Sequence, residues 1–137
     1  MPHLLIVDDD DAIRETLAEI GRDSGFSVAL AASVKDALIQ LERQAPDLVL
    51  TDVRLPGGSG MDIFKNVAAS SAEVVVMTGH GTVDNAVQAL RLGATDYLVK
   101  PICMERLEEI LKRIMINSGG ELPGTPFEEP GRFGKLF

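Results

Sequence analysis

The stretch DLVLTDVRLPGGSG, residues 47–60, decides the fold because it runs an apolar segment into a carboxylate and then into a turn. The continuous apolar run at residues 48–50 is typical of a strand buried on both faces of a sheet. Asp52 follows where that strand should end, so we expect its carboxylate at the rim of the sheet, where ligands of open α/β sheets bind. Pro56 and the glycines after it predict a loop rather than another regular element. The alternative that Asp52 only ends a strand or caps a helix near Met61 stays open at this point.

Length and composition indicate one acidic, globular domain. The chain has 137 residues, of which 45% are hydrophobic and 25% charged, and its formal net charge is −8. This charge disfavours direct binding of nucleic acid, which requires a basic patch. The single cysteine, Cys103, excludes an internal disulfide and fits a reducing cytosol. We find no signal peptide and no apolar run of membrane-spanning length, so the chain is expected to be cytoplasmic.

Strand and helix patterns alternate along the chain. Strands are expected at residues 3–7, 27–31, 48–52, 73–77 and 96–99. Helices are expected from residue 12 to a stop at Gly21 and Gly25, from an N-cap at Ser33 with Asp36 three positions on to a stop before Pro46, over residues 61–69, from Thr82 to Gly93, and over residues 104–116.

Five strands alternating with five helices predict an α/β fold in which helices cover both faces of a parallel sheet. We expect the flavodoxin-like, doubly wound strand order 2-1-3-4-5, whose switch point lies between strands one and three. That order would bring Asp8, Asp9 and Asp52 together in one crevice. Thr78 and Lys100, at the ends of strands four and five, would lie alongside.

The three carboxylates in this crevice would repel one another, and a divalent cation would remove the conflict. Mg²⁺ prefers oxygen ligands and is commonly held by one or two carboxylates together with phosphate oxygens. Asp10 and Asp11 are better explained as residues that cap the first helix and complement its dipole. The sequence therefore predicts a Mg²⁺ site at Asp8, Asp9 and Asp52.

Four motifs in this order resemble the receiver domain of bacterial two-component response regulators. They are LLIVDDD at residues 4–10, Asp52 followed by RLPGGSG, Thr78-Gly79, and GATDYLVKP ending in Lys100-Pro101. Each motif alone is weak, but the ordered set is specific and covers residues 3–116. The resemblance implies a signalling switch rather than an enzyme, with at most Mg²⁺-dependent self-phosphorylation and autodephosphorylation. It implies a sensor histidine kinase as the phosphodonor.

The resemblance also implies a role for each matching residue. Asp52 would be the phospho-acceptor, Asp8 and Asp9 the acidic pair that binds Mg²⁺, the backbone carbonyl of Arg54 a further metal ligand, Thr78 the switch hydroxyl, Tyr97 its aromatic partner, and Lys100 the ammonium that binds the phosphoryl group. It implies a cis Lys100–Pro101 bond, although sequence alone favours trans. Arg54 departs from the pattern in that its side chain could reach over the phosphate and alter autodephosphorylation.

Residues 77–101 resemble receivers that precede AAA+ ATPase domains in transcription activators of the nitrogen-regulator and dicarboxylate-transport-regulator type. We therefore expect a receiver domain at residues 1–117 and a linker at residues 118–137, ending before an output domain. Five glycines and three prolines lie between residue 119 and the end of the chain, which is a linker composition. The expected partners are the kinase and the chain's own output domain, without membrane or direct nucleic-acid contact.

A homodimer is a further expectation, formed through the fourth helix, fifth strand and fifth helix. The fourth helix would bury a stripe made of Val83, Ala86, Val87 and Leu90, and would present Asp84, Asn85, Gln88 and Arg91 to a partner. The fifth helix would use Leu107, Ile110, Leu111 and Ile114 for the core, leaving Met104, Met115 and Ile116 as apolar surplus. The alternative is that this surplus has no function, since scattered exposed apolar residues are normal.

Three other functions compete with this interpretation. A haloacid-dehalogenase-like phosphatase would use Asp8 and Asp10 as its D-x-D pair, but that class needs Thr or Val where this chain has Ala12, and room for a cap domain. A flavodoxin-type electron carrier would share the fold, but the acidic first loop is unsuited to a flavin phosphate. A stand-alone receiver that acts only by protein contact would share all of the motifs.

Overall fold

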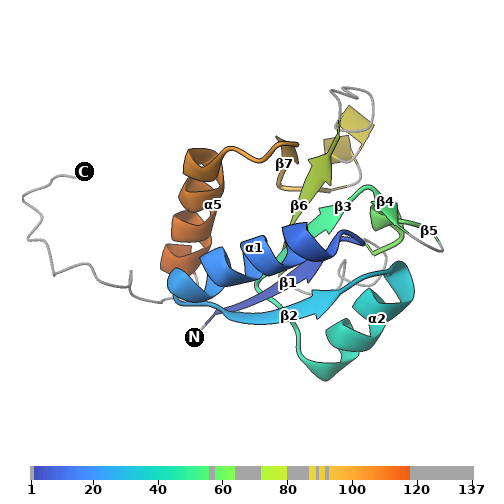
Figure 1. Ribbon diagram of the computed structural model, residues 1–137, viewed down its shortest axis with the longest axis horizontal. Helices are drawn as coiled ribbons and strands as arrows, with labels where there is room; N and C mark the ends of the chain where they lie inside the picture. The colour runs from blue at the N-terminus through green and yellow to red at the C-terminus, as the bar shows by residue number, and fades with distance from the viewer. Residues whose placement is uncertain are drawn as a thin grey trace, which may run out of the picture.

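The computed structural model describes residues 2–55, 58–63, 72–79, 87–88, 90–91 and 93–117. Strands and helices alternate from residue 3 to residue 52 (Figure 1). The main elements are β1 (His3–Val7), α1 (Asp11–Asp23), β2 (Ser27–Ala31), α2 (Val34–Arg43), β3 (Leu48–Asp52), β6 (Glu73–Thr78), β7 (Asp96–Val99) and α5 (Met104–Asn117). Between β3 and β6 lie two short strands, β4 (Arg54–Leu55) and β5 (Gly58–Ser59), and a 3₁₀ helix, η1 (Gly60–Ile63). Within these ranges no helix is long and apolar enough to span a membrane.

The five main strands form one parallel sheet in the order β2-β1-β3-β6-β7. The predicted order is confirmed, with β6 and β7 as the predicted strands four and five. The strand register aligns the carboxyl ends: Val7 pairs with Thr51, Asp52 with Met77, and Thr78 with Val99. The residues that end or follow these strands therefore meet at one edge of the sheet.

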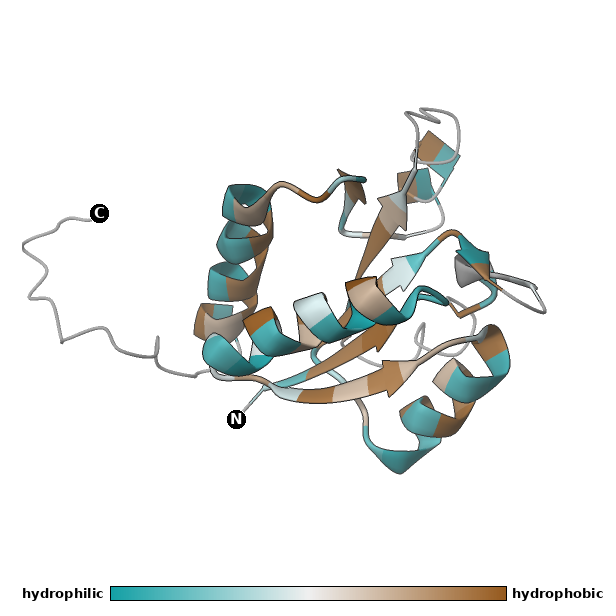
Figure 2. Ribbon diagram, in the orientation of Figure 1, coloured by the Kyte–Doolittle hydropathy of each residue, from teal (hydrophilic) through white to brown (hydrophobic). Residues whose placement is uncertain are grey.

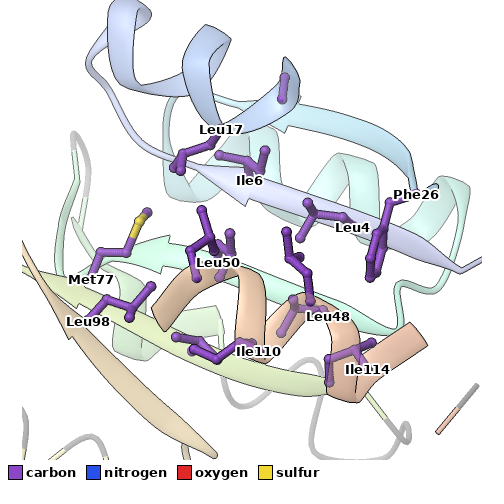
Figure 3. Close-up of a cluster of buried hydrophobic side chains, with 14 of the residues drawn as sticks. Leu4, Ile6, Leu17, Phe26, Leu48, Leu50, Met77, Leu98, Ile110 and Ile114 are labelled. Carbon is purple, nitrogen blue, oxygen red and sulfur yellow. The ribbon is translucent and has the colours of Figure 1, made fainter. Parts of the chain in front are cut away.

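Helices cover both faces of the sheet, which explains the continuous apolar runs in its strands. Successive strand residues point to opposite faces. Leu4 and Ile6 belong to a cluster with the apolar sides of α1 and α5, shown in Figure 3, whereas Leu5 and Val7 belong to a cluster with α2. Figure 2 shows the consequence, since hydrophobic strands lie between helices whose outer faces are hydrophilic.

The predicted starts of the first two helices are confirmed by their caps, whereas the expected cap at Thr82 lies outside the described residues. The Asp10 carboxylate accepts hydrogen bonds from the backbone N–H groups of Ala12 and Ile13, at 2.9 and 3.1 Å. The Ser33 hydroxyl accepts one from the Asp36 N–H at 3.1 Å. Both caps satisfy amide groups that have no partner inside the helix.

The prediction that Gly21 closes the first helix is wrong, because α1 continues through this residue to Asp23. Gly21 is buried, and a Cβ atom added to it would lie 2.7 Å from Cδ2 of Leu4. The glycine thus lets α1 approach β1 closely. Gly25, with φ of 96°, follows the helix as expected of a glycine in the left-handed region.

The segment after Asp52 also differs from the expected loop. Arg54 and Leu55 pair in antiparallel fashion with Ser59 and Gly58. The backbone of Gly58 lies close to the Asp62 side chain, since a Cβ added to Gly58 would lie 2.6 Å from Oδ2 of Asp62. The expected helix over residues 61–69 is described only as far as η1, and residues 64–71 lie outside the described part of the chain.

Two expectations about buried helix faces are wrong. Val87 and Leu90, expected in the buried stripe of the fourth helix, are 41% and 42% exposed, because the periodicity predicts an apolar face but not what covers it. Met115, expected as surplus, is only 2% exposed, because it continues the Leu107–Leu111 row at intervals of four residues. Met104 and Ile116 are exposed, as expected. Among the other fourth-helix residues, Gln88 and Arg91 are exposed, and Val83, Asp84, Asn85 and Ala86 lie outside the described ranges.

Candidate functional site

Three carboxylates meet at the carboxyl edge of the sheet. Asp8 directly follows β1, and its backbone N–H donates to the Ala31 carbonyl of β2 at 3.1 Å. Asp52 is the last residue of β3. One carboxylate oxygen from each of Asp8, Asp9 and Asp52 lies within 4.8 Å of the other two. Asp8 is fully buried, Asp52 is partly buried and Asp9 is exposed, so the cluster is open to solvent on the Asp9 side.

Lys100 links two of these carboxylates. Its Nζ donates to Oδ2 of Asp8 at 2.7 Å and to Oδ2 of Asp52 at 2.8 Å. Its backbone N–H donates to the Thr78 carbonyl at 2.7 Å, which continues the pairing of β7 with β6. The bond from Lys100 to Pro101 is cis, as the resemblance implies.

The environment keeps the Lys100 ammonium charged. Burial alone would lower the pKa of Lys100, but hydrogen bonds and the negative charges of Asp52 and Asp8 outweigh this effect and raise the pKa above its ordinary value. The ammonium therefore compensates part of the negative charge that strand order concentrates at this edge.

Backbone amide groups hold the remaining oxygens of Asp8 and Asp52. Oδ1 of Asp8 accepts a hydrogen bond from the Asp10 N–H at 2.9 Å, and Oδ1 of Asp52 accepts one from the Arg54 N–H at 3.2 Å. Each carboxylate thus has one oxygen on an amide and one on the ammonium, which fixes its plane. Arg54, two positions after Asp52, therefore contacts the site through its backbone N–H, while its side chain is exposed.

Arg14 is a residue of this region that sequence reasoning missed. Its Nη1 donates to the backbone carbonyl of Asp8 at 2.7 Å, and its Nη2 donates to the carboxylate of Asp11. The available signal was a basic residue in the first turn of the helix, separated by two residues from a run of four aspartates.

Thr78 and Tyr97 lie differently relative to the cluster. Thr78 ends β6 and is 2% exposed, next to the backbone of Lys100. Tyr97 is 36% exposed on the edge strand β7, where it lines a hollow of about 310 Å³ with Leu98, Val99, Cys103 and Arg106. The structure thus brings Thr78 to the site edge and places Tyr97 on a neighbouring surface.

A second, mainly apolar hollow of about 310 Å³ adjoins the site through Lys100. It runs between α1 and the segment that connects β7 to α5. Its lining residues are Ala12, Ile13, Thr16, Leu17, Ile20, Lys100, Pro101, Ile102 and Met104.

The carboxylate cluster has the chemistry of a site for a hard divalent cation. Within the described part of the chain, three carboxylate oxygens converge here and no histidine or thiolate joins them, which is the donor set that Mg²⁺ prefers. The open side leaves room for the water or phosphate oxygens that complete a Mg²⁺ octahedron. Asp8, Asp9 and Asp52 therefore fit a metal ion of this type.

Known proteins share this sequence and geometry. Residues 4–112 match the response regulator receiver domain family. The transcriptional regulatory protein ZraR of Salmonella typhimurium is 38% identical over 136 residues, covering 96% of this chain and 31% of that protein. The transcriptional regulatory protein FixJ of Azorhizobium caulinodans is 46% identical over 101 residues, covering 70% of this chain and 46% of that protein.

Solved structures agree. A putative response regulator from Chloroflexus aurantiacus superposes with a TM-score of 0.76 at 34% identity, covering 84% of this chain and 98% of that one. NtrX from Brucella abortus superposes with a TM-score of 0.77 at 32% identity, covering 86% of this chain and 27% of that one. The chain spans less than half the length of ZraR and FixJ, so the match concerns one domain of those proteins. On both sequence and fold, the chain belongs to the response regulator receiver domain family.

Proposed function

We propose that the chain is a phosphorylation-dependent signalling switch in which Asp52 accepts a phosphoryl group from a phosphohistidine of a sensor histidine kinase. The observation that carries this proposal is the Lys100 ammonium, which bridges Asp8 and Asp52 beside the exposed carboxylate of Asp9. A nucleophile, a fixed cation and a metal-type ligand set thus occupy one solvent-accessible edge.

The transfer needs an in-line nucleophile and positive charge around the phosphoryl oxygens. An Asp52 carboxylate oxygen forms the new O–P bond as the P–N bond to the imidazole breaks, and the electron pair of that bond remains on the ring nitrogen. Lys100 supplies a charge that is already within hydrogen-bonding distance of Asp52. When bound by Asp8, Asp9, Asp52 and the Arg54 carbonyl, Mg²⁺ would neutralise phosphoryl oxygens and lower the repulsion between anionic nucleophile and donor.

The donor must approach Asp52 from the open side of the cluster. The apolar hollow between α1 and the β7–α5 connection reaches this side at Lys100. We expect the phosphohistidine-bearing segment of the kinase to cover this hollow, because transfer requires the donor to be held in register with Asp52.

The phosphoryl group must then be detected by a contact that the unmodified chain lacks, since only a differential contact shifts a conformational equilibrium. Thr78 is suited to this role, because it ends the strand beside β3 and its backbone is joined to that of Lys100. Tyr97 lies farther along, on the exposed face of β7. The proposed signal runs from Thr78 to the surface that carries Tyr97 and α5.

The proposed target of the signal is an output domain that controls transcription, since ZraR and FixJ are transcriptional regulatory proteins. An AAA+ ATPase is the proposed output type, joined through a linker at residues 118–137, which lie outside the described part of the chain. A homodimer through the β7–α5 surface is the proposed intermediate step. A cytosolic location follows from the same proposal. The chain itself would act as a phospho-acceptor, with at most Mg²⁺-dependent self-phosphorylation and autodephosphorylation.

The competing phosphatase mechanism is less compatible with the site. Its second aspartate would be Asp10, whose carboxylate instead caps α1 through the N–H groups of Ala12 and Ile13. That carboxylate would have to leave the cap before it could act as a general acid. A stand-alone receiver would have the same site. It differs from the proposed regulator only in whether an output domain is attached to the linker.

Intact-mass spectrometry tests the proposal. Incubation with acetyl phosphate and Mg²⁺ should add one acid-labile phosphoryl group to the wild type, and none to Asp52→Asn. Asp23→Asn, which removes an exposed carboxylate at the far end of α1, is the matched control and should be phosphorylated like the wild type. An unchanged mass of the wild type would contradict the proposed function, and phosphorylation of Asp52→Asn would contradict the assigned acceptor.

A further inference from the structure

The Arg14 side chain is held against the backbone of the turn that carries Asp8 and Asp9. It lies in the first turn of α1, and its guanidinium donates to the Asp8 carbonyl at 2.7 Å and to the Asp11 carboxylate. Its side chain is 16% exposed, whereas that of Asp11 is 83% exposed. The planar guanidinium is thus held at two points, one on the backbone and one on its own helix.

The contact with the Asp8 carbonyl completes the hydrogen bonding of Asp8. The Asp8 N–H is bound to Ala31, and its two carboxylate oxygens accept from Asp10 and Lys100. The carbonyl is the remaining polar group, and it belongs to the peptide that joins Asp8 to Asp9. Because a peptide group is planar, a donor on its oxygen fixes the orientation of the whole unit.

Asp9 depends on this peptide more than Asp8 does. Within the described part of the chain, no hydrogen bond holds the Asp9 carboxylate, and the side chain is exposed. The direction of Asp9 is therefore set by its backbone. A rotation of the Asp8–Asp9 peptide would move the Asp9 carboxylate away from the 4.8 Å cluster with Asp8 and Asp52.

We propose that Arg14 is a positioning residue for the divalent-cation site: it orients the Asp8–Asp9 peptide so that Asp9 converges with Asp8 and Asp52. This inference rests on the proposed function, because it assumes that the cluster binds Mg²⁺. Arg14 does not touch the ion in this role. Replacing a group that orients a metal ligand commonly lowers metal affinity about 10- to 100-fold.

The charge of Arg14 makes the inference testable by the sign of an effect. A cation near a Mg²⁺ site repels the ion, so removing its charge should tighten binding if charge were its only contribution. Removing an orienting hydrogen bond should weaken binding instead. Arg14→Ala therefore separates the two roles.

The experiment is calorimetric titration of the purified 137-residue chain with Mg²⁺ alone. Arg14→Ala should bind Mg²⁺ about tenfold more weakly than the wild type, at the lower end of the range for orienting residues. Arg14→Lys should lie between them, because an ammonium can donate to the Asp8 carbonyl but lacks the planar fork. Arg22→Ala, an exposed arginine near the other end of α1, removes the same charge from the same helix and should leave the affinity unchanged.

Circular dichroism of the metal-free variants shows whether each one folds. If Arg14→Ala does not fold, the Mg²⁺ affinity of Arg14→Lys is the test. An affinity of Arg14→Lys equal to or higher than that of the wild type overturns the inference. Unchanged or tighter binding by a folded Arg14→Ala also overturns it. Asp9→Asn should abolish Mg²⁺ binding. If the wild type and Arg14→Ala bind Mg²⁺ with the same affinity, Arg14 has no positioning role, but the proposed function still stands. Wild type that does not bind Mg²⁺ would overturn the metal site and the role of Arg14 together.

Discussion

Lys100 and Asp52 are 48 positions apart in sequence, yet Nζ of the one lies 2.8 Å from Oδ2 of the other. The same nitrogen lies 2.7 Å from Oδ2 of Asp8, which is almost wholly buried. One ammonium thus offsets two carboxylates that strand order forces together. The charge balance of the site depends on this residue when no other cation is bound.

Lys100→Met should therefore lower the free energy of unfolding in the absence of divalent cations, by about 1–3 kcal/mol, because it leaves buried carboxylate oxygens unpaired. Addition of Mg²⁺ should stabilise the variant more than the wild type, since the ion replaces the missing charge and binds only the folded chain. Urea unfolding with and without Mg²⁺ measures both effects. If Mg²⁺ stabilised the two proteins equally, the Lys100 ammonium would not be offsetting the carboxylate charge that the ion neutralises.

Thr78→Ala should remain a substrate for phosphorylation but lose much of the conformational response. The reason is that the hydroxyl is proposed to bind the phosphoryl group only after transfer. Amide hydrogen exchange over residues 96–117, with and without beryllofluoride and Mg²⁺, measures the response. Thr78→Ser is the matched control, because it keeps the hydroxyl at this buried position and should respond like the wild type. A full response in Thr78→Ala would exclude Thr78 as the switch.

Much of this fold and site was predictable because the signals are local. The apolar runs, the caps at Asp10 and Ser33 and the carboxylate after each of two strands are readable from short windows, and parallel topology then brings Asp8, Asp9 and Asp52 to one edge. Lys100 joins them for the same reason, since β7 ends at that edge.

The predictions that were wrong or missing depend on distances between helices and strands, and a short stretch of sequence does not contain these distances. Gly21 has the sequence signature of a helix stop, and only the approach of α1 to Leu4 explains a glycine inside the helix. Met115 follows the core spacing but lies near the end of α5, so its burial depended on how far the helix extends over the sheet. Arg14 was missed because its partner is a backbone carbonyl, which sequence does not mark.

Gly21→Ala should destabilise the chain by about 1–3 kcal/mol, because the new methyl group overpacks a filled core. Its Cβ would lie 2.7 Å from Cδ2 of Leu4, which is wholly buried, and this cost should exceed the gain in helix propensity. Leu4→Val removes the clashing methyl group, so the double variant should be more stable than the two single effects add up to. Additive effects in urea unfolding would mean that the approach of α1 to β1 does not require a glycine.

The stability of the chain should fall as the pH drops below about 6.5, the ordinary pKa of histidine. Burial of His3 lowers its pKa, and the nearby charge of Asp47 and the contact with Ser27 only partly oppose this. The unfolded chain then takes up the proton more readily than the folded chain, so acid favours unfolding, and the contribution is regained as the pH rises through 6.5. His3→Asn should lose less stability than the wild type between pH 7.5 and 5.5 in urea titrations. An identical loss in both proteins would assign the pH dependence to other groups.

The last prediction concerns the surface through which the signal leaves the domain. Tyr97 and Val99 on β7 and Met104 at the start of α5 are 36%, 43% and 46% exposed, so this edge of the sheet presents apolar side chains to solvent. If a second copy of the chain covers them in the phosphorylated state, Val99→Glu should prevent association by burying a charge. Sedimentation with beryllofluoride and Mg²⁺ should then give dimers for the wild type and monomers for the variant.

Ile39→Glu is the matched control and should still form dimers. Ile39 is 44% exposed, but it lies on α2, which packs on the opposite face of the sheet from α1 and α5. Monomeric wild type in both states, or dimers of Val99→Glu, would count against this surface as the output of the switch.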